Sequence, residues 1–574
     1  MRLSSFFKRR QRYSPVEPDE IFIDSENLPQ FDTMQLEGRI APPLPAHTYR
    51  NFLILVSILL IAALAQAINL MVVQHEAFAA RAEENRLTRH EVPATRGRII
   101  DRLGVVLAEN MTTTTATTTN TQRSYPLGAA GAHLIGYVSY PKRDAQGVLY
   151  QSSVEGVQGI EAAYDEVLAG TPGRAVSETN ALGATLSGTI VTPSLAGRDV
   201  VLSIDSDLQQ EMYRVLEERV RGGFRGGTGG IIDIQNGELL ALASYPAFDP
   251  EVMSRGAPAE EVAAYQNDTR SPFLDRAVSG VYTPGSIIKP FVALAALMER
   301  VVTPTTTFVS TGKLVVPNPY DPESPSIFRD WRAHGAVDMR RALAVSSDVY
   351  FYIVGGGFED QRGLGITRLD QYASLFGFGS TTGYSALEAK GTVPSPAWKT
   401  ELFEGDEWRV GDTYNTSIGQ FGWQVTLLQV LRATAALANG GDLITPTLLR
   451  NTPGESISLN LPREDVRVVH EGMRAAVNAG GTAASLNNPS LSVAGKTGTA
   501  EVGVLKENIN SLVIGFFPYD APRYAFAVIL EKSKAGNTNG APAAMREIIQ
   551  WIVDNRPLMR NPQAKLTQPA GTLQ

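Results

Sequence analysis

The sequence contains no cysteine among its 574 residues. Disulfide bonds, zinc–thiolate sites, iron–sulfur clusters and cysteine nucleophiles are therefore excluded, although a protein without disulfides can work on either side of a membrane. Charged residues are also scarce, at 19% against the roughly 25% usual for soluble proteins. The formal net charge of −8 argues against a nucleic-acid-binding surface. Apolar residues make up 43%, which supplies a large core and excludes global disorder.

Charge is missing altogether from one long apolar segment, Phe52–Val73. About 20 apolar residues suffice to cross the hydrocarbon core of a bilayer, so this segment predicts a transmembrane helix. A buried core helix is an alternative, but uncharged helices of this length are uncommon in soluble cores. A cleaved signal peptide fits less well, because a long polar segment precedes the apolar one. The flanking arginines are nearly balanced, so they leave the orientation open.

The rest of the sequence divides into segments of different character. Residues 1–51 are polar, contain proline and lack a periodic apolar face, which predicts a mostly disordered tail. Residues 74–92 are charged and are expected to leave the bilayer as a helix. Residues 93–196 indicate short strands, turns and one helix. Residues 197–555 are richly apolar and orderly, and residues 556–574 are expected to form a flexible tail.

The orderly segment predicts an α+β fold. Residues 207–221 have the pattern of an amphipathic helix, and the following GGIIDIQNGELLALASYP predicts two strands joined by a turn at Asn236 and Gly237. Three more strands are expected in VAGKTGTAEV, SLVIGFF and YAFAVILEK. A helix at 541–555, ended by Pro557, closes the fold. Early and late strands around a mostly helical middle predict one sheet covered by helices.

A serine and a lysine three residues apart, Ser286 and Lys289, follow a Pro-Gly turn at the start of an apolar helix. Residues at this spacing share a helix face, so the amine is expected beside the hydroxyl. A serine nucleophile needs a neighbouring base, and a partly buried lysine of lowered pKa can serve. An ordinary helix start has the same pattern, and Ser5 and Lys8 repeat the spacing in the polar tail. Alone, the pair is a weak signal.

A second cluster of polar residues, Ser346-Ser347-Asp348, lies between RRALAV and VYFYIV, where two helices could meet. A hydroxyl and a polar acceptor at this point could relay a proton and hold the lysine. A simple helix cap is the alternative interpretation.

A third cluster, Lys496-Thr497-Gly498-Thr499, begins an apolar strand. A glycine inside a strand lets a ligand or another backbone approach closely. A lysine with two neighbouring hydroxyls suits a carboxylate ligand, although an ordinary edge strand can also carry such residues.

In this order, the three clusters resemble the Ser-x-x-Lys, Ser-x-Asn/Asp and Lys-Thr-Gly motifs of the penicillin-interacting serine enzymes. Further segments resemble class B penicillin-binding proteins, and together the similarity covers about residues 93–555. These segments are RGRIIDRLGVVLAEN, HLIGYV, GVQGIEAAYDEVLAGTPG, GRDVVLSIDSDLQ, GELLALASYPAFDP, DRAVSGVYTPGSIIKP and NTSIGQFGWQVTLLQ.

The resemblance implies a single-pass membrane protein with an extracytoplasmic catalytic domain. Residues 74–196 would form the β-rich pedestal, or dimerisation domain, and residues 197–555 a transpeptidase domain with a five-stranded antiparallel sheet flanked by helices. The N-terminal tail would then lie in the bacterial cytoplasm.

The resemblance also implies a reaction. Ser286 would attack the penultimate D-Ala carbonyl of a peptidoglycan stem peptide, and Lys289 would take its proton. Ser346 would deliver a proton to the leaving D-Ala, and Asp348 would help to hold Lys289. An amine of a neighbouring stem peptide would then attack the acyl-enzyme and form the cross-link, while β-lactams would leave a stable ester on Ser286.

Substrate binding is implied for the third cluster. Lys496, Thr497 and Thr499 would bind the terminal carboxylate, with Gly498 between them. The backbone N–H groups of Ser286 and Thr499 would form the oxyanion hole. The middle motif has Asp348 where asparagine is commoner, which keeps an acceptor but removes an amide donor.

The implied partners are stem peptides, β-lactams, the membrane, a polytopic glycosyltransferase and other cell-wall synthesis proteins. No nucleic acid, metal ion or organic cofactor is implied. Three alternatives remain: a membrane β-lactam sensor, a D,D-carboxypeptidase that hydrolyses the acyl-enzyme, and a noncatalytic cell-wall scaffold. The sequence does not separate a role in elongation from one in division.

The segment before the catalytic domain contains a histidine and acidic residues that could suggest a second active site. His133 lies in an apolar run, where a core histidine is the favoured interpretation. Glu161, Asp165 and Glu166 fit one side of a short helix and are expected to face solvent or the neighbouring domain. The segment is therefore interpreted as a binding module.

Overall fold

A computed structural model describes most of the chain, namely residues 45–78, 87–114, 119–143, 149–151, 153–179, 185–318, 321, 323–503 and 507–561. The predicted N-terminal tail up to residue 44 and the last thirteen residues, 562–574, lie outside these ranges. The chain divides into two compact units, Met1–Thr88 with Glu178–Ser187 and Arg89–Ser177 with Gly188–Gln574. The second unit thus contains most of the segment 93–196 together with all of the residues from 197 onward.

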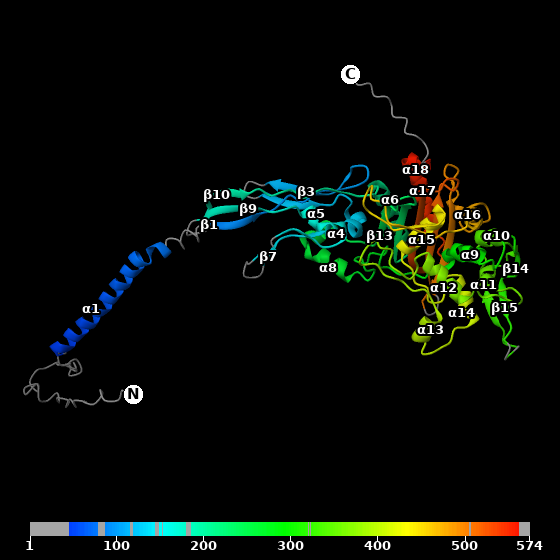
Figure 1. The fold of residues 1–574 in the computed structure, drawn as a ribbon, viewed down its shortest axis with the longest axis horizontal. Coiled ribbons are helices and arrows are strands. Elements are labelled where there is room, and N and C mark those ends of the chain that lie inside the picture. Colours follow the sequence, from blue (N-terminus) through cyan, green and yellow to red (C-terminus); the bar gives the residue numbers. More distant parts are fainter. Residues whose placement is uncertain are drawn as a thin grey trace, which may run out of the picture. The chain divides into compact units, whose positions relative to one another are not determined.

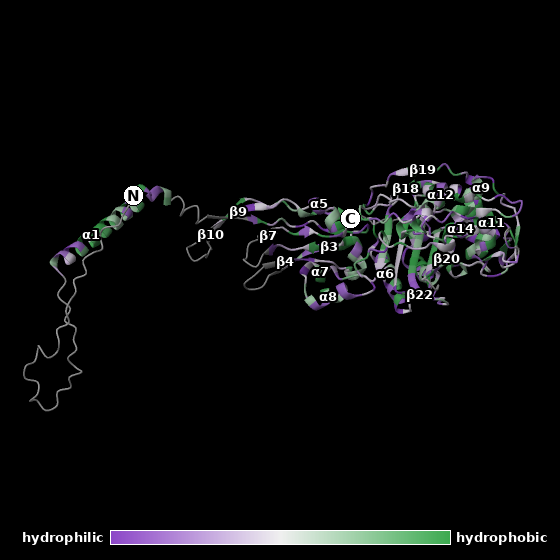
Figure 2. Cartoon of the chain, turned by 90° about the horizontal axis from the view of Figure 1, so that it is seen from below, coloured by the Kyte–Doolittle hydropathy of each residue, from purple (hydrophilic) through white to green (hydrophobic). Residues whose placement is uncertain are grey.

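The apolar segment forms one helix that is long and apolar enough to cross a membrane. It consists of α1 (Ala46–Ile68) and a π-helical turn, η4 (Asn69–Val73). No residue of α1 is buried in protein, and most of the helix carries the colour of hydrophobic residues (Figure 2). The helix begins six residues before the predicted Phe52 and ends at the predicted Val73. The last six residues of the expected tail, 46–51, are therefore helical.

The helix expected at 74–92 is only partly correct. Residues 75–78 are helical, but Leu87–Val92 form strand β1, in a sheet of order β1-β9-β10. The charged residues of this segment do not decide its structure, because pairing with other strands overrides local propensity.

The segment after β1 contains the expected short strands, but several short helices in place of the single helix expected. One sheet has the order β11-β2-β3-β4, and two small pairs are β5-β8 and β6-β7. The bounds are β2 (Ile99–Ile100), β3 (Val106–Thr114), β4 (Thr119–Ser124), η5 (Gly128–Gly131), α3 (Ala132–Ile135), β5 (Val138–Ser139), β6 (Lys142–Arg143), β7 (Leu149–Gln151), β8 (Glu155–Gly156), α4 (Gly159–Ala163), α5 (Asp165–Ala169), β9 (Gly173–Thr179), β10 (Thr185–Thr192) and β11 (Val200–Val201).

The acidic residue at the centre of this region is placed differently from the prediction. Glu161 is fully buried rather than exposed, because Arg96 Nε donates to one of its carboxylate oxygens at 2.6 Å and Arg123 Nε to the other at 2.7 Å. The carboxylate pairs with two buried arginines and so ties α4 to β4. His133 packs edge-on against Phe248 with both ring nitrogens shielded from solvent, as expected of a core histidine.

The C-terminal part of the chain is built on a five-stranded antiparallel sheet of order β13-β12-β22-β21-β20 (Figure 1). It joins the two early strands to the three late ones, as the sequence predicts. The bounds are β12 (Gly226–Asp233), β13 (Leu239–Tyr245), β20 (Ala494–Val502), β21 (Asn508–Phe517) and β22 (Tyr524–Lys534). The turn after β12 contains Gly237 at φ +80°. A Cβ there would lie 2.6 Å from Thr445 O, so only glycine fits.

Helices cover both faces of this sheet. Because successive strand residues point to opposite faces, Ile231 joins the core under α6 (Ser206–Arg221) and α17 (Ala541–Asn555), and Ile232 joins the core under α15 (Leu427–Asn439). The helix α16 (Arg463–Val477) packs on β20. The long apolar runs of β21 and β22 follow from burial on both faces.

The chain beyond α17 is more ordered than predicted. Helix α17 ends at Asn555, but Pro557–Arg560 form another short helix, α18. Arg556 forms ion pairs with Asp205 at 2.6 Å and Asp207 at 2.7 Å. The expected flexible tail therefore does not begin at residue 556.

The middle of the chain forms a helical region beside the sheet. Its elements are α7 (Pro250–Arg255), α8 (Ala259–Asn267), η6 (Gly285–Ile288), α9 (Lys289–Met298), β14 (Phe308–Ser310), β15 (Lys313–Val316), β16 (Ser326–Arg329), β17 (Gly335–Val337), α10 (Met339–Val345), α11 (Asp348–Gly356), α12 (Gly365–Leu375), α13 (Pro396–Leu402), α14 (Val410–Ser417), β18 (Asp442–Ile444), β19 (Ser456–Ser458) and η7 (Ala484–Leu486).

Candidate active site

Ser286 and Lys289 lie one turn apart at the start of a helix, as predicted. Ser286 is in the 3₁₀ turn η6, and Lys289 is the first residue of α9. Side chains three residues apart are eclipsed in a 3₁₀ helix, so both project from the same side. Gly285 has φ +54°, which allows the tight turn before Ser286. Ser286 is half-buried, whereas Lys289 is fully buried.

Strand β20 approaches this turn closely, and it does so at the predicted glycine. A Cβ on Gly498 would lie 2.9 Å from Pro284 O and 2.9 Å from a side-chain carbon of Ile287. Only a residue without a Cβ lets the strand pack here. The sequence left open whether a ligand or another backbone needs this glycine, and in the structure it is the backbone of η6.

The middle motif lies between two helices and contains both a cap and a site residue. Ser347 caps α11, because its hydroxyl accepts a hydrogen bond from Tyr350 N at 3.3 Å. Ser346 has a left-handed backbone, φ +58°, at the end of α10. Asp348 begins α11. The helix-cap interpretation therefore applies to Ser347, and the interpretation as a lysine-binding site applies to Ser346 and Asp348.

The three clusters meet at the hydroxyl of Ser346. Lys289 Nζ donates to Ser346 O at 2.9 Å, to Ser346 Oγ at 3.3 Å and to Asp348 Oδ1 at 2.6 Å. From the other side, Lys496 Nζ donates to Ser346 Oγ at 2.8 Å and to Thr497 O at 2.7 Å. Residues 150 positions apart in sequence thus share one hydroxyl.

The electrostatics of the site centre on its two buried amines. Lys496 is fully shielded from solvent, and this burial lowers its pKa well below the ordinary value for lysine. The charge of Lys289 lowers it further, and the carboxylate of Asp348 opposes the shift.

The remaining residues of the third cluster lie along β20, at one end of the sheet order. Thr497 is half-buried and Thr499 is exposed. A Cβ on Gly285 would lie 3.0 Å from the carbonyl oxygen of Thr499, so this oxygen points toward η6. The N–H of a strand residue points to the same side as its C=O, which directs the Thr499 N–H toward Ser286's turn.

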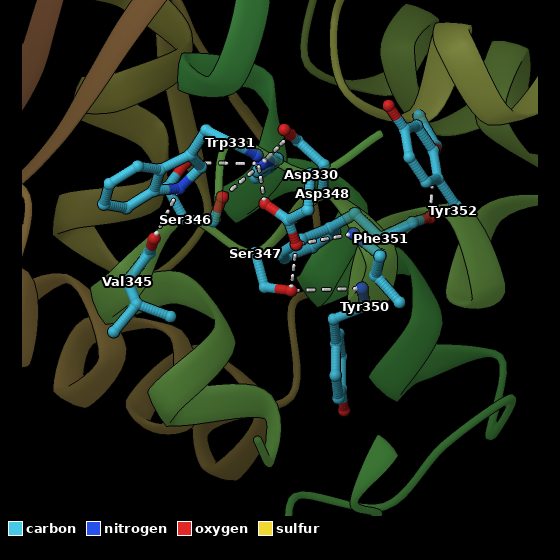
Figure 3. Close-up of polar contacts among 12 residues, drawn as sticks. Asp330, Trp331, Val345, Ser346, Ser347, Asp348, Tyr350, Phe351 and Tyr352 are labelled. Carbon is cyan, nitrogen blue, oxygen red and sulfur yellow. Dashed lines mark hydrogen bonds and ion pairs between the residues drawn. The ribbon is translucent and has the colours of Figure 1, made fainter. Parts of the chain in front are cut away.

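One functional candidate that sequence reasoning missed is Asp330, a buried carboxylate behind the middle motif (Figure 3). It accepts four hydrogen bonds, from Ser310 Oγ at 3.1 Å, Ser347 Oγ at 2.9 Å, Val349 N at 3.1 Å and Trp331 N at 2.9 Å. His334 Nε2 lies 3.3 Å from Asp330 Oδ1, the oxygen that also accepts from Trp331 N. Burial lowers the pKa of His334.

The neighbouring Trp331 supports the same loop. Its indole N–H donates to Val345 O at 3.2 Å, the carbonyl just before Ser346. No spacing or composition signal in FRDWRAHG identifies these contacts.

Among the described residues, no group of three or more His, Cys, Asp or Glu could hold a metal ion.

Comparisons with known proteins identify two domains in the chain. Residues 227–550 match the model of the penicillin binding protein transpeptidase domain, and residues 112–202 match the penicillin-binding protein dimerisation domain. The peptidoglycan D,D-transpeptidase MrdA of Haemophilus influenzae is 33% identical over 473 residues, covering 76% of this chain and 70% of that protein. The Escherichia coli K12 FtsI transpeptidase is 27% identical over 429 residues, covering 73% and 64%.

Solved structures give the same result. PBP2 of Pseudomonas aeruginosa in complex with WCK 5153 is 31% identical, with a TM-score of 0.67, covering 83% of this chain and all of that chain. The PBP2–MreC complex of Helicobacter pylori contains a chain that is 25% identical, with a TM-score of 0.68, covering 82% and 99%.

Proposed function

Since this chain belongs to the class B penicillin-binding proteins, the serine D,D-transpeptidases of cell-wall synthesis, we propose that Ser286 is the nucleophile that forms its acyl-enzyme. Its target is the penultimate D-Ala carbonyl of a peptidoglycan stem peptide, and terminal D-Ala leaves. The observation that carries this proposal is the meeting of Lys289 and Lys496 at Ser346 Oγ, next to the turn that holds Ser286.

The neighbouring residues take complementary roles in acylation. Lys289 accepts the proton of Ser286, because it lies one turn further along the same helical face as the serine. Ser346 passes a proton to the leaving amine, since its hydroxyl contacts both lysines. Asp348 holds Lys289 through the 2.6 Å ion pair.

Strand β20 binds the donor peptide. Lys496, Thr497 and Thr499 hold the terminal carboxylate, and the close approach at Gly498 places them beside the serine. The N–H groups of Ser286 and Thr499 stabilise the tetrahedral oxyanion, a contribution of about 3–4 kcal/mol per donor in comparable enzymes. An amine of a second stem peptide then attacks the ester and completes the cross-link.

The chain is organised to carry out this reaction outside the cytoplasm. Residues 52–73 span the membrane, residues 1–51 lie in the cytoplasm, residues 74–196 form the pedestal and the transpeptidase domain begins at 197. The pedestal docks other cell-wall synthesis proteins, including a polytopic glycosyltransferase. Support comes from the H. pylori PBP2–MreC complex and from a 26% identical chain of a peptidoglycan synthase complex that coordinates polymerization and crosslinking.

Labelling with fluorescent penicillin tests the assignment of Ser286. The full-length protein in detergent should form one covalent adduct, which peptide mapping should place on Ser286. The variant Ser286→Ala should lose the label and keep its melting temperature, because it removes only a half-buried hydroxyl. Ser279→Ala, a nearby serine whose hydroxyl contacts only Leu387 O among the described residues, is the matched control and should still be labelled. An adduct on Ser346 or Ser347 contradicts the proposal.

Acceptor dependence separates the alternatives. A transpeptidase should form cross-linked product in proportion to the acceptor amine supplied, whereas a carboxypeptidase should release D-Ala at a rate independent of it. A noncatalytic scaffold should form neither product and no penicillin adduct.

A further inference from the structure

The active site contains two buried amines for one carboxylate. Lys289 and Lys496 are both fully shielded from solvent, and each contacts Ser346 Oγ, at 3.3 Å and 2.8 Å. Among the described residues, the carboxylate in contact with either amine is that of Asp348. A buried charge is tolerated only when it is paired, so two ammonium groups and one carboxylate leave one positive charge in excess. The resting site is therefore expected to hold one ammonium and one neutral amine.

The contacts differ between the two lysines. Lys289 makes the ion pair with Asp348 at 2.6 Å and lies 5.4 Å from the centre of the Phe351 ring. The partners of Lys496 are neutral oxygens, the hydroxyl of Ser346 and the carbonyl of Thr497. The low pKa that burial gives Lys496 agrees with this asymmetry.

Other titratable groups near the pair do not change this balance. Asp330 accepts hydrogen bonds from Ser347 Oγ and Val349 N and, among the described residues, makes no ion pair with either lysine. His334 contacts Asp330, and burial favours its neutral form.

We propose that Asp348 keeps the single positive charge on Lys289 at rest, and that the carboxylate of an arriving ligand draws this charge across Ser346 to Lys496. This inference rests on the proposed function and deepens it, because it makes the ligand's carboxylate the trigger that frees the base.

The transfer conserves protons and charge. The Lys289 ammonium gives a proton to Ser346 Oγ while Ser346 gives its own hydroxyl proton to the Lys496 amine. Ser346 ends unchanged, Lys289 becomes a neutral amine that can take the proton of Ser286, and Lys496 becomes an ammonium beside the ligand's carboxylate. One ion pair, Lys289 with Asp348, is exchanged for another, Lys496 with the ligand.

This switch depends on the carboxylate at position 348. An asparagine there carries no charge, so it would not hold the proton on Lys289, and the base would be free without a ligand. In this chain the ligand's carboxylate is thus expected to act on the rate of acylation and not only on binding.

Benzylpenicillin and its methyl ester provide the test on the full-length protein in detergent. For each ligand, the first-order acylation constant is measured separately from the dissociation constant. In the natural sequence the ester should lower the acylation constant by about a hundredfold, the effect of removing one strong charge contact from a transition state. In Asp348→Asn this loss should shrink below about tenfold, while the ester weakens binding similarly in both proteins. Equal losses of the acylation constant in both proteins overturn the inference.

Lys496→Arg provides a second, independent measurement. A guanidinium keeps the positive charge that attracts a carboxylate, but it is always protonated and has no site for the proton from Ser346. If Lys496 acts only by its charge, the acylation constant of this variant stays near the natural value, which contradicts the inference. The inference predicts a severe loss of the acylation constant with a smaller change in the dissociation constant.

The outcome for Ser286→Ala keeps the two proposals apart. If that variant is still labelled, the proposed function itself fails. If it is not labelled but Asp348→Asn and the natural protein respond equally to the ester, only the charge transfer is wrong. Melting temperatures of all variants identify any that fail to fold. Within each folded protein, the ratio of the acylation constants for benzylpenicillin and its methyl ester does not depend on the amount of active protein.

Discussion

Lys289 is surrounded by acceptors, with two oxygens of Ser346 and one of Asp348 within 3.3 Å of its amine. Such an environment suits either a base or a fixed positive charge. Lys289→Arg distinguishes the two, because arginine keeps the charge but does not release its proton. We expect penicillin acylation to fall about as far as in Lys289→Ala, roughly a hundredfold or more.

The rate of fluorescent penicillin labelling measures this effect. Lys313→Arg, at an exposed position of β15, is the control and should label at the natural rate. Near-native acylation by Lys289→Arg would assign this residue an electrostatic role only.

Lys496 makes the stability of the protein depend on pH. Burial lowers its pKa in the folded state well below 10.5, whereas in the unfolded chain the amine titrates near that value. Between the two pKa values the unfolded state binds more protons, so stability rises with pH through this window. Lys496→Met removes the titrating group. Its melting temperature relative to the natural protein should therefore be highest near neutral pH and should decline as the pH approaches 10.5.

Differential scanning calorimetry across this pH range checks the prediction. A constant difference in melting temperature between Lys496→Met and the natural protein would show that the amine titrates alike in the folded and unfolded states.

The start of α11 is held by the carboxylate of Asp330, which belongs to neither α10 nor α11. Asp330 accepts from Ser347 Oγ and Val349 N, and so fixes the turn that presents Ser346. Asp330→Asn replaces an ionised acceptor by an amide. We expect a loss of about 1.5–3 kcal/mol in the free energy of unfolding, the range for buried hydrogen bonds to a charged group.

The same substitution should lower the acylation constant more than it changes the dissociation constant, because it moves the proton relay and not the binding strand. Asp338→Asn is the control: Asp338 caps α10 through Arg341 N at 2.8 Å, and asparagine caps equally well. A stable Asp330→Asn with natural acylation would show that Asp330 does not position the motif.

The accuracy of the sequence predictions also differs between elements. The amphipathic pattern at 207–221 and the hairpin at Gly237 are confirmed almost to the residue, because local periodicity and turn chemistry determine them. Strand β1 was predicted as a helix, since its structure depends on pairing with distant strands. The burial of Glu161 was missed for the same reason, because its arginine partners lie 38 and 65 residues away.

The same distinction applies to the site. The resemblance implied that the three clusters serve one site, and the structure brings Lys289 and Lys496 together at Ser346 Oγ. Asp330 could not be found in this way, because its four donors come from segments with no common spacing.

For the whole molecule, membrane orientation remains a prediction with a direct test. The substrate is cross-linked outside the cytoplasmic membrane, so α1 must place its N-terminal side in the cytoplasm and Ser286 outside. Protease added to intact spheroplasts should digest the chain beyond about residue 74 and leave an N-terminal tag intact. A reporter that works only outside the membrane should be active after residue 574 and silent at residue 1. An accessible tag at residue 1 would contradict both the topology and the proposed function.

The order of strands in the catalytic sheet also determines at which stage of synthesis the domain can fold. Gly226 of β12 pairs with Glu531 of β22, so the centre of the sheet joins the beginning of this domain to its end. Until the chain is made through β22, the apolar hairpin of β12 and β13 has an open edge, which is prone to aggregation. Such distant pairing also slows folding. A polypeptide that ends before β22 therefore lacks a central strand of the sheet. We expect such a polypeptide to be degraded and not to be a weaker enzyme.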